Sequence, residues 1–237
     1  MTGASSGIGR ACAIALAATG AEVTLMSRSR EKLKLVASDI RQTGGAATVA
    51  DCDVTDPKAV AEAVQAAPPV DFLVTCAGVN RPGPLVETSV EDYSEMVDLN
   101  LGGTFFVTQA VVRGMLAKGS GGSIVHMSSQ MGHIGYPGRT VYCMTKHGVE
   151  GLTKALAVEL APDNIRVNAV APTFINTELT APMFDNPSFK SDVLSRIPLG
   201  QIGEVSDVVG AVMFLLSPAA SMITGTSIKV DGGWTAQ

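Results

Sequence analysis

A tyrosine and a lysine four residues apart, Tyr142 and Lys146, are the two side chains of this sequence whose types and spacing most clearly suggest chemistry. On a helix, residues at this spacing lie on one face, one turn apart. A phenol is a poor acid near neutral pH, with an ordinary pKa of about 10, and we expect the lysine cation to lower that pKa. Ser129 could hold a substrate oxygen while Tyr142 gives or takes its proton. The pattern predicts proton transfer on an alcohol or a ketone; the alternative is a chance pair on a solvated helix face.

Two predicted elements must position these side chains. Residues 124–127 form an apolar run typical of a buried strand, which delivers Ser129 at its carboxyl end. A loop rich in glycine and proline leads from this strand to a predicted helix that carries Tyr142 and Lys146. The apolar residues that define one stripe of this helix are Val141, Met144, Gly148, Leu152, Leu156 and Leu160.

A glycine-rich turn at the start of the chain leads into an alanine-rich helix. Glycines allow the backbone to approach a pyrophosphate closely, and a helix N-terminus supplies free N–H groups. Such a turn alone is a weak indication, because a tight strand-to-helix turn needs no ligand. Its occurrence together with the Tyr142 motif favours dinucleotide binding by the residues of the turn, which are Gly3, Ser5, Ser6, Gly7, Ile8 and Gly9.

A dinucleotide-binding fold also needs a buried strand before this turn, whereas only Met1 precedes Thr2. That strand would be central in the sheet and covered by helices on both faces. We therefore expect the intact protein to carry one further strand, of about 5–6 residues, before Met1.

The end of the next apolar run, residues 21–26, bears on the choice of dinucleotide. In dinucleotide folds an acidic residue at this position binds the ribose 2′-OH, and an arginine accommodates a 2′-phosphate. No acid is present here, and Ser27, Arg28 and Arg30 follow the run. The pattern predicts NADP(H) as the cofactor, with NAD(H) as the alternative if the arginines are only surface charges at a helix start.

Strands and helices alternate along the chain, which predicts an α/β fold with a doubly wound, Rossmann-like parallel sheet. We expect one domain spanning residues 1–237, with predicted strands at 21–26, 46–50, 70–75, 124–127, 165–170 and 227–230. Residues 174–199 contain three prolines and several apolar side chains. Long irregular segments of this kind are usually lids or binding loops, so we expect this one to bind substrate.

The composition excludes several functional classes. Hydrophobic residues make up 46% and charged residues 16% of the chain, which suits a packed core. The net charge of −5 argues against a nucleic-acid partner, and no apolar run approaches the length of about 18 residues that a membrane span needs. The four cysteines lack metal-ligand spacing, and the chain does not start with a secretory signal. We expect a cytoplasmic protein without a bound metal.

Taken together, these motifs resemble the short, single-domain branch of the short-chain dehydrogenase/reductase family. The resemblance runs from Thr2 to Trp234 and rests on Thr2-Gly3-x-x-x-Gly7-x-Gly9, Asn100, Ser129 and Tyr142-x-x-x-Lys146 in this order. It implies hydride transfer between a nicotinamide dinucleotide and a small carbonyl or alcohol substrate. It also implies a seven-stranded sheet and a homotetramer, less often a dimer. The chain departs from the family pattern at Cys76 and Thr173, where an asparagine and a glycine are usual, and in the absent first strand.

The resemblance also assigns roles to individual residues. Ser129 would polarise the carbonyl, Tyr142 would be the general acid/base, and Lys146 would bind the nicotinamide ribose and depress the tyrosine pKa. Asn100 would hold a water in a proton relay to solvent. The residues expected to contact the dinucleotide are Gly3, Ser5, Ser6, Gly7, Ile8, Gly9, Ser27, Arg28, Asp53, Val54, Ala77, Gly78, Tyr142, Lys146, Pro172, Ile175 and Thr177.

The loop after Ser129 and residues 174–199 are expected to line the substrate end of the cleft. The expected substrate contacts are Ser129, Gln130, His133, Tyr136 and Tyr142, with Asn80, Met131, Arg139 and Cys143 at the mouth. The polar members indicate a hydroxylated substrate such as a sugar acid or a polyol, whereas apolar members would equally suit a 3-oxoacyl compound. His133 is as compatible with a structural role in the loop.

Two other classes of function remain open at this point. One is a non-catalytic dinucleotide-binding sensor or scaffold on the same fold, which the complete set of Ser129, Tyr142 and Lys146 disfavours. The other is an epimerase or dehydratase of the longer family branch, which usually needs an additional C-terminal substrate region.

Overall fold

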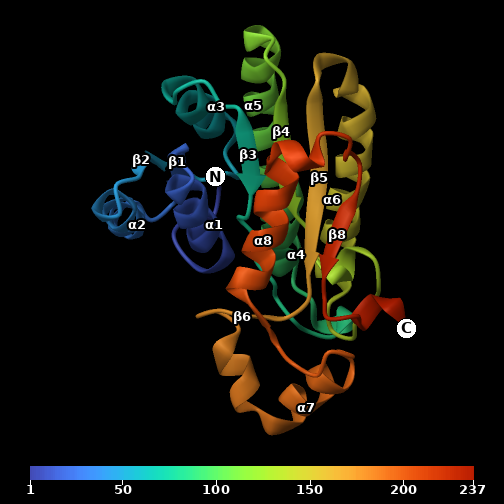
Figure 1. Ribbon diagram of the computed structural model, residues 1–237. Helices are drawn as coiled ribbons and strands as arrows, with labels where there is room; N and C mark the ends of the chain where they lie inside the picture. Colours follow the sequence, from blue (N-terminus) through green and yellow to red (C-terminus); the bar gives the residue numbers. More distant parts are fainter.

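A parallel sheet with helices on both faces forms the body of the protein in the computed structural model, which describes residues 1–237 (Figure 1). One block of the sheet pairs β1 (Glu22–Ser27) with β2 (Ala46–Asp51). The other block has the order β3-β4-β5-β8, formed by Phe72–Thr75, Gly122–Met127, Ile165–Pro172 and Ser227–Val230. Every pairing is parallel, which confirms the predicted fold class.

The first two residues lie between the two blocks of the sheet. Thr2 forms parallel bridges to both Met26 in β1 and Thr75 in β3. The amide of Thr2 donates to the carbonyl of Val74 (3.0 Å), and the carbonyl of Met1 accepts from Met26 (2.9 Å). The family resemblance implies a sheet of seven strands, and six of them are present. Met1 and Thr2 occupy the position of the seventh strand, between β1 and β3.

Successive side chains of a strand point to opposite faces of the sheet. Both faces therefore carry apolar side chains, and helices cover both. On β3, Leu73 faces the core shared with α3 (Pro57–Ala66), α5 (Thr104–Lys118) and α6 (Thr140–Glu159). Its neighbour Val74 faces the opposite core, shared with α1 (Gly7–Ala18) and α8 (Val205–Leu216). The helix α2 (Arg30–Gln42) packs with α1 over β1 and β2.

The buried face of α6 is offset by one position from the stripe of apolar residues expected from the sequence. Met144 is 47% exposed, whereas Thr145 and Lys146 are buried. The burial continues at Val149 and Glu150. The helix therefore turns polar side chains toward the sheet, because it borders a cleft as well as a core.

Residues 174–199 hold more regular structure than expected. They include β6 (Ile175–Asn176), which pairs with β7 (Gly203–Glu204), and the helix α7 (Pro187–Ser195). Asn186 caps α7 by accepting hydrogen bonds from two amides of its first turn. Figure 1 shows α7 beyond the carboxyl ends of β5 and β8, the edge at which open α/β sheets bind ligands.

The long helical stretch before β4 is interrupted, as expected. The helix α4 (Val90–Val97) and α5 are joined by a π-helical turn over Asp98–Gly103, which contains Asn100. Such turns occur frequently at functional sites. None of the helices is both long and apolar enough to cross a lipid bilayer.

Candidate active site

The glycine turn packs directly against the end of β3. Gly3 has a φ of +63°, and a Cβ at this position would lie 2.8 Å from the backbone nitrogen of Ala77. A Cβ on Gly9 would lie 2.2 Å from the carbonyl oxygen of Gly3. Only glycine fits at these two positions, and the turn therefore brings the start of α1 close to the cleft. The N-cap residue Ser6 makes no side-chain hydrogen bond to the helix, so its side chain leaves the first N–H groups available to an anion.

A cleft of about 620 Å³ opens above the carboxyl ends of the strands. It joins the glycine turn, the ends of β1, β3, β4 and β5, and the start of the 174–199 segment. The predicted residues that line it are Gly3, Ser5, Ser6, Gly7, Ile8, Gly9, Ser27, Arg28, Asp53, Val54, Ala77, Gly78, Asn80, Ser129, Gln130, Met131, Tyr142, Lys146, Pro172, Ile175 and Thr177. The structure thus brings into one cleft two motifs that lie more than a hundred residues apart in the sequence.

Several lining residues were not among the expected contacts. They are Ser29, Lys32, Cys52, Cys76, Val79, Arg81, Leu99, Met127, Ser128 and Thr173. Most of them are sequence neighbours of an expected residue at the end of a strand, and this position in the sequence could have predicted that they line the cleft. Lys32 had no such signal, because it belongs to the charged first turn of α2 and resembles a surface residue.

Lys146 points from α6 to the end of β4. Its side chain is 5% exposed, and its Nζ donates to the carbonyl oxygen of Met127 at 2.8 Å. The same Nζ lies 5.6 Å from the centre of the Tyr142 ring. Burial lowers the pKa of Lys146 to about 8, and the nearby Cys76 and Glu150 oppose that shift. The ammonium group therefore titrates close to neutral pH.

Tyr142 differs from the expectation in its acidity. Burial raises its pKa to about 12, although a hydrogen bond from Ser129 and the charge of Arg139 act in the opposite direction. The expected lowering of this pKa is therefore not found in the protein by itself: desolvation of the phenolate outweighs the Ser129 hydrogen bond and the charge of Arg139, and Lys146 is not among the groups that shift it. At neutral pH Tyr142 is a protonated phenol, which is the form that can donate a proton.

Ser129 is held at the end of β4 beside Tyr142. Its Oγ accepts a hydrogen bond from the amide of Met131 (3.1 Å) and donates to the carbonyl of Pro172 (3.4 Å). These contacts come from the following turn and from β5, so two elements orient the hydroxyl. Ser129 and Tyr142 therefore converge on one side of the cleft, as the sequence predicted.

Asn100 lies behind the cleft and holds the loop after β3. Its amide makes reciprocal hydrogen bonds with the backbone of Val79, at 2.8 and 2.9 Å, and donates to Thr145 Oγ1 at 3.2 Å. A Cβ on Gly78 would lie 3.1 Å from Asn100 Oδ1 and 3.9 Å from Lys146 Nζ. The π-helical turn thus connects the β3 loop to α6 through Asn100, and the role of Asn100 in a proton relay stays a prediction.

The far end of the cleft carries the residues expected at the adenosine. Asp53 accepts hydrogen bonds from the amide and hydroxyl of Thr55 at 3.0 and 2.8 Å. These bonds, chiefly the backbone one, hold its pKa below the ordinary value, and the charge of Arg28 acts in the same direction. Arg28 and Lys32 both line the cleft, whereas Arg30 does not. Two cations therefore flank this end.

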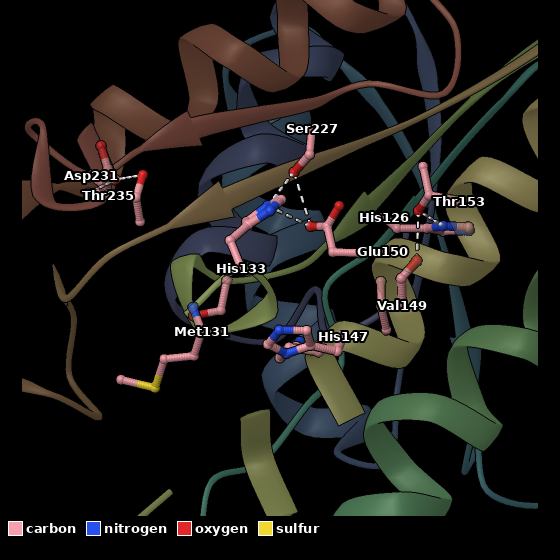
Figure 2. A network of polar contacts seen from close by, with 12 residues as sticks. His126, Met131, His133, His147, Val149, Glu150, Thr153, Ser227, Asp231 and Thr235 are labelled. Atoms are coloured by element: carbon pink, nitrogen blue, oxygen red, sulfur yellow. Dashed lines mark hydrogen bonds and ion pairs between the residues drawn. The ribbon is translucent and has the colours of Figure 1, made fainter. Parts of the chain in front are cut away.

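His133 does not line the cleft. Its Nε2 lies 3.1 Å from the hydroxyl of Ser227 and 3.2 Å from Oε1 of Glu150, and the Ser227 hydroxyl donates to the same carboxylate at 2.9 Å. Figure 2 shows this closed network between the loop after β4, α6 and the start of β8. These contacts give His133 the structural role in the loop that the sequence allowed, and they do not fit the predicted substrate contact.

Tyr136 is also turned away from the lining of the cleft. Its hydroxyl donates to Asp192 of α7 at 2.8 Å, and its ring packs edge-on against Phe174 and Trp234. Arg196 lies over the same ring, 5.5 Å from its centre. Tyr136 therefore anchors α7 to the loop that carries Ser129, a role that its sequence position does not reveal.

The whole chain is similar to known oxidoreductases. It matches the family model described as enoyl-(acyl carrier protein) reductase over residues 3–235. It is 42% identical to L-xylulose reductase of Bos taurus over 236 residues, which cover 100% of this chain and 95% of that protein. Gluconate 5-dehydrogenase of Gluconobacter oxydans is 38% identical over 239 residues, covering 99% and 93%. A crystal structure of gluconate 5-dehydrogenase from Burkholderia cenocepacia J2315, in complex with NADP and tartrate, has a TM-score of 0.96 and 34% identity, covering 100% and 94%.

Proposed function

Because this chain belongs to the short-chain dehydrogenase/reductase family, we propose that its cleft interconverts a secondary alcohol and a ketone by hydride transfer with NADP(H). The observation that carries the proposal is the convergence of Ser129, Tyr142 and Lys146 with the glycine turn on one cleft. The proposed substrate is a polyol, a sugar acid or a 3-oxoacyl compound.

The residues of the cleft fit a dinucleotide. Gly3 and Gly9 let the turn pack closely, because a Cβ at either position would collide with the backbone of Ala77 or of Gly3, and the buried hydroxyl of Thr173 has no hydrogen-bond partner. We assign the pyrophosphate to the glycine turn and the adenine to Asp53 and Val54. The ribose would lie by Ala77 and Gly78, and the nicotinamide amide by Pro172, Ile175 and Thr177.

NADP(H) rather than NAD(H) is supported by charge at the adenosine end. Arg28 and Lys32 line the cleft there, and β1 ends without an acidic residue. A 2′-phosphate carries charge that these cations would balance, and arginine in particular matches its geometry. The related gluconate 5-dehydrogenase from Burkholderia cenocepacia, crystallised with NADP, agrees with this assignment.

The protein supplies orientation and the proton. The bound nicotinamide would supply hydride to the carbonyl carbon in reduction and accept it in oxidation. In reduction, the Tyr142 hydroxyl donates its proton to the substrate oxygen as the C=O bond becomes a C–O–H group, and the resulting phenolate regains a proton from solvent. Ser129 would turn its hydroxyl proton from the carbonyl of Pro172 to the same substrate oxygen, and the Lys146 cation would stabilise the transient phenolate. Oxidation of the alcohol reverses these steps.

The test is a panel of ketones and secondary alcohols, assayed with NADPH and NADH in parallel by the absorbance of the reduced nicotinamide. We expect turnover with at least one panel member, and Tyr142→Phe should lower kcat by about 10²- to 10⁴-fold with cofactor affinity nearly unchanged. The matched control is Tyr93→Phe, which alters an exposed tyrosine on α4. Retention of activity in Tyr142→Phe would remove the residue from its role. Cofactor binding without turnover of any compound would instead indicate a dinucleotide sensor.

The same proposal includes a homo-oligomer, of which the homotetramer is the expected form. Large apolar side chains are exposed on the outer faces of α5 and α6: Phe105 and Phe106 at 42% and 36%, Met144 at 47% and Val158 at 80%. Burial of such a surface against a second copy would be favourable. Light scattering coupled to size-exclusion chromatography tests the assembly, and a monomer at micromolar concentration would contradict it.

We also propose one domain and a cytoplasmic location. All four cysteines are free thiols, which agrees with a reducing compartment. Fractionation of the native source, followed by immunodetection, tests the location, and recovery in a membrane or secreted fraction would contradict it.

A further inference from the structure

Tyr142 lies in the first turn of α6, which begins at Thr140. The first turn of a helix has N–H groups without intrahelical partners, and helix ends fray. The N-cap residue Arg139 makes no side-chain hydrogen bond to this turn. Lys146 lies one turn further along and is tied to β4 through Met127. The proton donor, unlike the lysine, therefore depends on contacts outside the helix for the position of its turn.

Tyr136, in the loop before α6, supplies two of these contacts. Its carbonyl accepts a hydrogen bond from the amide of Arg139 at 3.2 Å, next to the first residue of the helix. Its ring and that of Tyr142 both pack against one small buried cluster, formed by Met131, Phe174, Val193, Ile197 and Trp234. The backbone and the ring of Tyr136 therefore both support the start of α6.

Tyr136 is fixed in turn by α7. Its hydroxyl donates to Asp192 at 2.8 Å, the only hydrogen bond that joins residues 187–195 to a distant part of the chain. The Asp192 carboxylate also accepts from Nε (3.1 Å) and Nη2 (3.0 Å) of Arg196. The Arg196 guanidinium lies 5.5 and 5.9 Å from the ring centres of Tyr136 and Trp234. The carboxylate that accepts from Tyr136 is thus itself held in place by a second group.

The ion pair between Asp192 and Arg196 is not buried. The two side chains are 42% and 44% exposed, and exposed ion pairs contribute little to stability. The pair therefore matters for the direction of the Asp192 carboxylate more than for the stability of the fold. Loss of the hydrogen bond from Tyr136 should accordingly leave the protein folded and loosen the start of α6.

We propose that Tyr136 and Asp192 are positioning residues for the general acid: their hydrogen bond fixes the start of α6 against α7 and so keeps the Tyr142 hydroxyl directed at the substrate oxygen. The inference rests on the proposed function, which assigns the proton transfer to Tyr142. Neither Tyr136 nor Asp192 lines the cleft, so both act through Tyr142. Catalytic rates are sensitive to small displacements of a reacting group, even when the cause lies far from the chemistry.

The experiment measures ketone reduction with saturating NADPH, on the panel ketone for which the wild type has the highest kcat/KM. Tyr136→Phe keeps the ring and should lower kcat by about 3- to 10-fold, the range for one hydrogen bond. The KM of the ketone and the Kd of NADPH should change by less than about 2-fold. Asp192→Ala should give a similar loss of kcat. The double variant should lose no more than either single variant, because all three lack the same hydrogen bond.

The solvent isotope effect separates a positioning role from a merely structural one. In Tyr136→Phe a displaced Tyr142 transfers its proton more slowly, so that the proton transfer limits turnover more than in the wild type. The ratio of kcat in H₂O to kcat in D₂O should therefore rise. A lost substrate contact would instead raise KM and leave this ratio unchanged. Asp192→Asn keeps an acceptor for the Tyr136 hydroxyl and should recover part of the kcat that Asp192→Ala loses.

Two matched controls remove the same groups elsewhere. Tyr93→Phe removes the hydroxyl of an exposed tyrosine on α4, and Asp185→Ala removes an exposed carboxylate two residues before α7. Both should leave kcat and the isotope effect unchanged.

The outcomes distinguish this inference from the proposed function. Unchanged kcat in Tyr136→Phe, an unchanged isotope effect, or additive losses in the double variant would overturn the inference and leave the alcohol–ketone activity in place. Absence of turnover of every ketone and alcohol by the wild type would refute the proposed function itself.

Discussion

The ammonium group of Lys146 donates to the carbonyl oxygen of Met127, 2.8 Å away, and so ties α6 to the last residue of β4. The contact keeps the lysine buried beside Tyr142 but directs its hydrogen bond to the backbone. Burial then decides both acidities: the lysine pKa falls to about 8 and the tyrosine pKa rises to about 12. The protein by itself is therefore prepared to donate a proton to a ketone at neutral pH.

We expect ketone reduction to lose rate above about pH 8. Tyr142, with a pKa raised to about 12, stays protonated there, whereas Lys146, 5.6 Å from the centre of the Tyr142 ring, loses the charge that we propose stabilises the phenolate during the reaction. Glu150 raises the lysine pKa, so Glu150→Gln should move the alkaline limb of kcat/KM to lower pH. Ser227→Ala removes a hydrogen bond to Glu150 and keeps its charge, and should move that limb less. Identical pH profiles for wild type and Glu150→Gln would contradict this account.

Arg28→Ala should weaken NADPH binding by about 10- to 100-fold, the range for loss of a charged hydrogen bond, and change NADH affinity little. The physical reason is that NADPH alone carries a 2′-phosphate at this end of the cleft. Fluorescence titration of both reduced cofactors measures the difference. Arg30→Ala is the matched control, because Arg30 does not line the cleft. Equal losses of both affinities in Arg28→Ala would defeat the NADP(H) assignment.

His126 should make the fold sensitive to acid. It is 0% exposed on β4, its ring nitrogens lie 3.1 Å from Thr108 Oγ1 and 2.9 Å from Thr153 Oγ1, and burial lowers its pKa to about 4. A depressed histidine pKa means that the unfolded chain binds the proton more tightly. Its contribution is present above the unfolded pKa of about 6.5 and is lost as pH falls from there to about 4, with a cost of about 3 kcal/mol.

Urea unfolding at pH 7 and pH 4.5 tests this prediction. The free energy of unfolding of the wild type should fall between these values by more than that of His126→Gln, whose amide can still bond to the two threonines but does not titrate. Parallel losses in the two proteins would assign the acid sensitivity to other groups.

Gly9→Ala should disrupt the glycine turn. Its Cβ would lie 2.2 Å from the carbonyl oxygen of Gly3, so the turn must shift and the cofactor cradle with it. We expect a loss of stability of about 1–3 kcal/mol and a loss of NADPH affinity. Gly114→Ala on α5 is the control: nothing lies within 4 Å of its Cβ, and the substitution should stabilise the helix by about 0.5–1 kcal/mol. Thermal melts measure the change in stability, and cofactor titrations measure the change in NADPH affinity. Unchanged NADPH affinity in Gly9→Ala would show that the turn is not the binding site.

The sequence by itself determined the alternation of strands and helices, the glycine turn, and the pairing of Ser129 with Tyr142 near one strand end. These features depend on local periodicity and on backbone sterics, which short stretches of sequence carry. The interruption at Asn100 could be predicted for the same reason, since glycines and a polar residue break an apolar helix.

Only the tertiary structure decided the acidities and the direction of the side chains. Desolvation depends on what covers a group, so the sequence could indicate that Lys146 neighbours Tyr142 but not that burial would raise the tyrosine pKa. His133 and Tyr136 follow Ser129 closely, yet contacts with Glu150 and Asp192, distant in the chain, turn both away from the cleft lining.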